Sequence, residues 1–416
     1  MIAAPSPVAL EPARAAALHQ SMRTLVSEYI DSSPETREID AYQAGYKMAT
    51  ESPTSKVLYR KAAESAYRDF MVISDSSTTL DEYVELVYCE SEAIFRMQQA
   101  LFYGENLLDA RILNVTAERT EDDPFAHFGI RYKKMSMPLN GVFEPRDTAY
   151  LECTGSFVNK KGLRGVYVVR ESMDFEEVPP FPGVTRFYIK AIMLYTEWPN
   201  GKVESVQLLQ ANPLGKMPAL VFNKTAMNYS HISDDNAKYL QQKRLLMWIH
   251  SHKPKHPSGK TKVCSSCAGA FRGLRARHEC WGCFESMCGK CVVSIHRVLT
   301  LPDGGMKATP EEFCKRCYVQ ARSHRTSSSG LSLRRLHGPS EDDMSPRGSH
   351  HSTHSSRSNC SHETRSSSGN ESGHETNFAV IDSAAMEAQL SQMQLAIETQ
   401  RYLVAQMRER LEAQVI

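Results

Sequence analysis

The sequence has no run of about 20 apolar residues, the length that a membrane-spanning helix requires. Its first 20 residues hold three prolines and no apolar core of signal-peptide type. It also lacks a Gly-rich phosphate loop, a Gly-x-Ser-x-Gly motif and a His-Glu-x-x-His motif. The formal net charge is only +1 over 416 residues, which gives no overall case for nucleic-acid binding. These absences predict a cytoplasmic protein that is not an enzyme.

Cysteine is scarce outside one short stretch of the chain. Three cysteines, Cys89, Cys153 and Cys360, are scattered, and the other eight lie between residues 264 and 317. These eight form four Cys-x-x-Cys pairs: Cys264/Cys267, Cys280/Cys283, Cys288/Cys291 and Cys314/Cys317. Tetrahedral zinc takes four such thiolates, so eight predict two closed, structural zinc sites. A disulfide framework is the alternative, but it requires an oxidising compartment.

The spacing of the pairs predicts how they share the two ions. The gaps between successive pairs are 12, 4 and 22 residues. The central gap is too short for both middle pairs to bind one ion comfortably, so alternate pairs should cooperate. We therefore expect one zinc on the first and third pairs, and the other zinc on the second and fourth.

The region 263–318 resembles the FYVE zinc finger, a family that binds phosphatidylinositol 3-phosphate on endosomal membranes. Phe271 follows the second ligand by four residues, as is usual in the family. Residues 276–281 read Ala-Arg-His-Glu-Cys-Trp, where the family signature is Arg-Arg/Lys-His-His-Cys-Arg. Arg277 and His278 match this signature. The resemblance implies a zinc-stabilised module that lies peripherally on endosomal membranes.

Several positions depart from the family pattern. The upstream Trp-x-x-Asp element is missing, and Glu-Phe-Cys at 312–314 replaces Arg-Val-Cys. The signature itself is broken at Ala276, Glu279 and Trp281, and Phe284 stands where the family has Gly. A carboxylate at 279 repels a phosphate, so we expect weak binding with little phosphoinositide selectivity. A RING-like ubiquitin-ligase module also interleaves two zincs and is a further alternative.

The charge of the finger suits an anionic membrane surface. Residues 251–322 hold 13 Lys/Arg and 5 Asp/Glu, a formal +8 that two tetrathiolate zinc centres reduce to about +4. We predict headgroup contacts from Arg275, Arg277 and His278, and insertion of Leu274 between headgroups. The alternative is a basic face that is merely solvated.

Residues 55–250 predict an α+β domain. Alternating or continuous apolar runs predict strands, helical spacing predicts a helix over 80–102, and a long helix is expected over 217–250. The strands are expected at 57–60, 67–73, 107–115, 125–133, 149–157, 166–170, 185–195 and 203–210.

This order resembles the START-type helix-grip fold, in which a curved sheet wraps a long final helix. Residues 150–152, 165–172 and 212–224 carry the resemblance, which implies a pocket for one lipid or sterol. Arg170, Glu171 and Arg186 are candidate polar residues of that pocket, or surface ion pairs. A filled core that serves as a protein-interaction scaffold is the alternative.

The ends of the chain complete the predicted domain organisation. Residues 1–54 form an N-terminal helical segment, and 260–322 the finger. Residues 323–376, rich in Ser, His and Arg, form a disordered linker. Residues 380–416 predict a coiled coil that makes a homodimer, although a lone helix packing back on the protein is an alternative. Its seam residues are seven apart: Leu390, Ile397, Val404 and Leu411.

Together these features predict a lipid-binding, membrane-docking adaptor. The alternative is a scaffold in which neither lipid site works.

Overall fold

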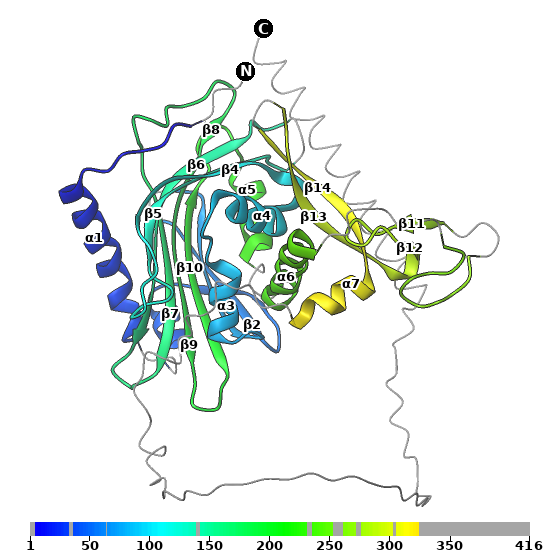
Figure 1. Ribbon diagram of the computed structural model, residues 1–416. Helices are drawn as coiled ribbons and strands as arrows, with labels where there is room; N and C mark the ends of the chain where they lie inside the picture. The colour runs from blue at the N-terminus through cyan, green and yellow to red at the C-terminus, as the bar shows by residue number, and fades with distance from the viewer. Residues whose placement is uncertain are drawn as a thin grey trace, which may run out of the picture. The chain divides into compact units, whose positions relative to one another are not determined.

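The computed structural model describes residues 5–32, 36–63, 65–138, 142–230, 235–252, 261–271, 276–302 and 305–323 (Figure 1). Apart from Ser323, the predicted linker lies outside this described part, and so does the predicted coiled coil with all four seam residues. None of the described helices is long and apolar enough to cross a membrane.

A ten-stranded, almost entirely antiparallel sheet forms the larger part of the fold. Its order is β1-β2-β3-β10-β9-β7-β6-β5-β4, and β8 adds a short parallel pairing to β6. Every predicted strand is present, and β1 is an additional strand that pairs with β2. The bounds are β1 Lys47–Glu51, β2 Ser55–Lys61, β3 Arg68–Ser76, β4 Leu107–Ala117, β5 His127–Met135, β6 Arg146–Val158, β7 Arg164–Ser172, β8 Thr185–Arg186, β9 Tyr188–Glu197 and β10 Val203–Asn212.

Side chains alternate between the two faces of this sheet, as strand geometry requires. On β5, Phe128, Ile130 and Tyr132 are buried in a core cluster with Met22 and Val26 of helix α1 (Pro12–Ile30). The N-terminal helix predicted from its apolar spacing is thus present and covers the outer face of the sheet (Figure 1). A short helix, α2 (Arg37–Gln43), follows it.

Helices on the inner face correct two of the predictions. The helix expected over 80–102 is two helices, α3 (Leu80–Val87) and α4 (Glu92–Tyr103), because Ser91 caps a new helix by accepting from Ile94 N–H. The helix expected over 217–250 is likewise described as α5 (Ala219–Ser230) and α6 (Asn236–His252).

A buried lysine fastens α6 to α3. Lys243 Nζ donates to the backbone carbonyls of Glu85, Leu86 and Tyr88 at 2.6, 3.0 and 3.0 Å. These carbonyls at the end of α3 have no partner within the helix, so the ammonium acts as its C-terminal cap. Arg244 adds a bidentate pair with Glu85.

The smaller module is built from two hairpins and a helix. Strands β11 (Arg277–Glu279) and β12 (Ser286–Cys288) form the short hairpin, and β13 (Val292–Thr300) and β14 (Met306–Cys314) the long one, before α7 (Lys315–Gln320). Two short 3-10 turns, Gly289–Cys291 and Ala321–Ser323, complete it.

The two modules share hydrophobic cores. Met306 and Ala308 of β14 pack with Leu107 and Ala110 of β4, while Leu245, Leu246 and Ile249 of α6 pack among the buried cysteines. Gly104, which ends α4 with φ +55°, faces the ring of His296 on β13, and a Cβ there would lie 3.1 Å from that ring. The absence of a side chain therefore permits the close approach of α4 and the finger.

Candidate functional site

The eight cysteines gather into two clusters of four. Cys264, Cys267, Cys288 and Cys291 form one, and Cys280, Cys283, Cys314 and Cys317 the other, with the sulfurs of each cluster within 4.8 Å of one another. This is the alternate pairing expected from the spacing. Sulfur–sulfur distances of 3.9 Å (Cys267–Cys288), 4.0 Å (Cys280–Cys317) and 3.8 Å (Cys283–Cys314) are close to the ~3.8 Å edge of a tetrahedron with zinc–sulfur bonds of ~2.3 Å.

Backbone geometry around the pairs also fits a metal. The residues after two pairs, Ala268 and Phe284, have φ of +55° and +58°, a conformation that costs a non-glycine residue about 1–2 kcal/mol. Backbone N–H groups also face the sulfurs, as Cys314 N–H does toward Cys280 Sγ at 3.2 Å and Cys288 N–H toward Cys264 Sγ at 3.4 Å. Because four thiolates hold each site closed, zinc there would supply structure and not catalysis.

His278, which matches the FYVE signature, pairs with a residue that departs from the family pattern. His278 Nδ1 lies 2.9 Å from Glu312 Oε2, so the motif histidine pairs with the carboxylate that replaces the family's Arg of Arg-Val-Cys. Arg277 is exposed and stacks over Phe271 at 4.7 Å. Leu274 and Arg275 lie outside the described residues. Two carboxylates, Glu279 and Glu312, therefore accompany the predicted headgroup residues.

A cavity of about 210 Å³ lies between the inner face of the sheet and helices α3–α6. Most of its lining is apolar, which suits the body of a hydrophobic ligand. The apolar lining includes Phe70, Val72, Tyr83, Val87, Phe102, Met135, Met137, Phe187, Ile189, Met193, Leu209 and Phe222.

Charged groups on the inner face form a buried network beside this cavity. Glu152 Oε1 accepts from Arg131 Nε at 2.5 Å, and its Oε2 accepts from Arg170 Nε at 2.7 Å. Burial alone would raise the pKa of Glu152, but Arg131 and Arg170 hold that pKa at about 2. His127, 3.2 Å from Arg131, has its pKa lowered to about 4 by burial and by that arginine, so it is neutral at physiological pH.

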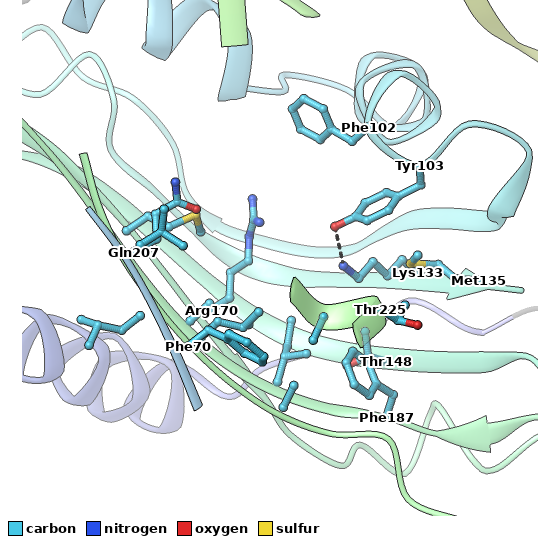
Figure 2. A pocket seen from close by; sticks show the side chains of 18 of the residues that line it. Phe70, Phe102, Tyr103, Lys133, Met135, Thr148, Arg170, Phe187, Gln207 and Thr225 are labelled. Atoms are coloured by element: carbon cyan, nitrogen blue, oxygen red, sulfur yellow. Dashed lines mark hydrogen bonds between the residues drawn. The ribbon is translucent and has the colours of Figure 1, made fainter. Parts of the chain in front are cut away.

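The three polar candidates divide between the two faces. Arg170 lines the cavity, whereas Glu171 pairs with Lys190 at 3.2 Å and Arg186 pairs with Asp147 at 2.9 Å. Sequence reasoning missed Lys133, whose Nζ donates to Tyr103 at 3.1 Å inside the cavity. Figure 2 shows Lys133 and Arg170 rising from the sheet toward Phe102 and Tyr103 of α4. The signal was present in β5, where Arg131 and Lys133 alternate with apolar residues.

Comparison with known proteins identifies the finger. Residues 254–323 match the family model of the FYVE zinc finger, which confirms the resemblance found in the sequence. No curated protein matches the chain.

Three solved structures are among those similar to part of the chain. Human StAR-related lipid transfer protein 5 is 17% identical, with 54% of this chain and 98% of that one covered and a TM-score of 0.40. Human STARD10 is 14% identical, with coverages of 59% and 85% and a TM-score of 0.38. A STAR-related lipid transfer protein of Xanthomonas axonopodis is 18% identical, with coverages of 47% and 96% and a TM-score of 0.36.

Proposed function

We propose that this protein is a non-enzymatic adaptor that holds one lipid or sterol in the sheet cavity and docks peripherally on endosomal membranes through its FYVE finger. The observation that carries the proposal is the presence in one chain of an apolar cavity under α3–α6 and of two four-cysteine clusters in a FYVE finger. The cavity would hold an apolar molecule out of water, and the finger would bring the protein to a membrane surface.

Docking would be weak and electrostatic. Arg275, Arg277 and His278 would meet the headgroups and Leu274 would insert, while Glu279 and the Glu312 pair oppose phosphate binding. Dimerisation through residues 380–416 would compensate for the weak binding of a single finger, because two linked fingers bind one membrane surface with higher avidity.

Two measurements on the full chain test these halves separately. Mass spectrometry of the purified protein should detect a co-purifying lipid or sterol. Flotation should show binding to vesicles of phosphatidylcholine with phosphatidylserine, reduced by salt and little changed by added phosphatidylinositol 3-phosphate.

The variant Arg277→Ala should weaken flotation, whereas Lys307→Ala, which removes an exposed charge from the long hairpin, should not. No bound lipid, together with no flotation on any vesicle, would favour the protein-interaction scaffold instead.

A further inference from the structure

The buried inner face of the sheet carries more positive than negative charge. Arg131, Lys133 and Arg170 point to this face, and Glu152 is the carboxylate that pairs with two of them. Both oxygens of Glu152 are already engaged by the two arginines. Lys133 is a further buried cation of this face, and no salt bridge joins it to Glu152.

Lys133 is only 8% exposed, and the hydrogen bond and cation–π contacts that it makes within the described part of the chain are with tyrosines. Its Nζ donates to the Tyr103 hydroxyl and lies 4.7 and 6.0 Å from the ring centroids of Tyr103 and Tyr150. No described carboxylate forms a salt bridge with it. Because a buried charge is costly unless it is paired, this ammonium is suited to a negative group that enters the cavity.

Unpartnered donors line the same cavity. Within the described residues, Gln207 Nε2 and Asn236 Nδ2 are buried atoms without a hydrogen-bond partner, and Asn236 is only 4% exposed. Lys133 uses one of its three protons on Tyr103. Leaving such groups unpaired costs about 1–3 kcal/mol each, so the lining favours a ligand with several acceptor oxygens.

The electrostatic potential is positive at the side of the cavity where Lys133 and Arg170 lie near Tyr103. Burial alone would raise the pKa of Tyr103, yet the Lys133 ammonium and Arg170 hold that pKa below its ordinary value. An anionic head would meet the same field from the two cations, while the apolar lining, with Phe70, Phe187 and Phe222, surrounds the rest of the molecule.

We propose that the cavity binds an amphiphile whose single anionic head, a carboxylate or a phosphate monoester, pairs with Lys133. This inference rests on the proposed lipid-binding function and narrows its ligand class from lipids or sterols in general to acidic amphiphiles.

A matched pair of probes isolates the charge of the head. A fluorescent long-chain fatty acid and its methyl ester share the apolar chain and differ in charge at one end, and a long-chain alkyl phosphate supplies the second anionic head. We expect the full-length protein to bind the acid or the alkyl phosphate at least about tenfold more tightly than the ester, which corresponds to about 1.4 kcal/mol.

Two variants assign that preference to Lys133. Lys133→Met should reduce the affinity for the anionic probe to that for the ester and leave ester binding unchanged. Lys134→Met removes the same charge from the next position of β5, whose side chain alternates to the other face, and should change neither affinity. If the Lys133→Met variant no longer binds the ester, the experiment is repeated with Lys133→Gln, which keeps a hydrogen-bond donor at this position but removes the charge.

The outcomes separate this inference from the function on which it rests. Tight binding of the ester and the acid alike would overturn the anionic ligand and leave the hydrophobic cavity standing. An unchanged acid preference in Lys133→Met would overturn the role of this lysine. Failure of the wild type to bind any of the probes would count against the lipid-binding function itself.

Discussion

His278 and Glu312 form a pair across the finger, with Nδ1 of the histidine 2.9 Å from Oε2 of the carboxylate. They come from β11 and β14, and the histidine is 28% and the glutamate 45% exposed. The family signature has basic residues where Glu279 and Glu312 stand here. The finger thus keeps its cysteine framework, while the surface around Arg277 and His278 carries two additional negative charges.

Removing these charges should strengthen membrane docking. The double variant Glu279→Gln, Glu312→Gln should bind anionic vesicles roughly 10- to 30-fold more tightly, since each charge near such a surface is worth about 1 kcal/mol. Flotation against lipid concentration measures this. Glu311→Gln is the control, because it removes the same charge from the next position of β14, where the side chain alternates to the other face and pairs with Arg297 at 3.5 Å. An affinity unchanged in the double variant, with two zincs retained, would show that these carboxylates do not face the membrane.

Loss of zinc should destabilise the sheet domain as well as the finger. We expect elemental analysis to find two zincs per chain, and Cys280→Ser to unfold residues 263–318. Amide exchange should then rise in α4 and β4, because β14 packs its Met306 and Ala308 against that part of the sheet domain.

The matched control for this experiment is Cys360→Ser, a cysteine outside the described residues. Exchange in α4 and β4 that stays at the wild-type rate after loss of the finger would contradict a shared core.

The sequence predicted the strands and the cysteine pairing well. It was a poorer guide to the helix boundaries and the cavity lining, because tertiary contacts determine these features. Strand alternation and Cys-x-x-Cys spacing are local patterns, so β2 to β10 and both clusters could be predicted from them. The break between α3 and α4 depends on the Ser91 cap and on Lys243, which is distant in sequence. The cation at Lys133 could not be placed in a cavity until β5 was registered against β6.

The buried network should make Glu152 important for stability. Glu152→Gln leaves two arginines without their carboxylate and should cost about 3–5 kcal/mol at neutral pH. Since the folded pKa of Glu152, about 2, lies below its unfolded value, its contribution is present above that unfolded value and is lost as the pH falls toward 2.

Denaturant unfolding at several pH values measures this effect. Glu171→Gln, which breaks the partly exposed pair with Lys190, should cost less than about 1 kcal/mol. Equal costs for the two variants would mean that the network contributes no more than a surface pair.

The C-terminal segment should assemble the protein into dimers. Ile397→Asp with Val404→Asp would place charges in the apolar seam and should yield monomers in sedimentation experiments at micromolar concentrations. Thr399→Asp with Ala405→Asp adds the same charges at outer heptad positions and should leave the dimer intact. A monomeric wild type would mean that this helix packs within its own chain, and the avidity argument for docking would be lost.

Helix α6 belongs by sequence to the sheet domain and by packing to both modules. Leu245, Leu246 and Ile249 lie in the cluster that holds Cys264, Cys280 and Phe313, while Lys243 caps α3. A protease cut between His252 and Thr261 would therefore leave two fragments that remain bound to each other. Expressed separately, the N-terminal fragment would present an apolar helix face to water, and aggregation of that fragment would be expected.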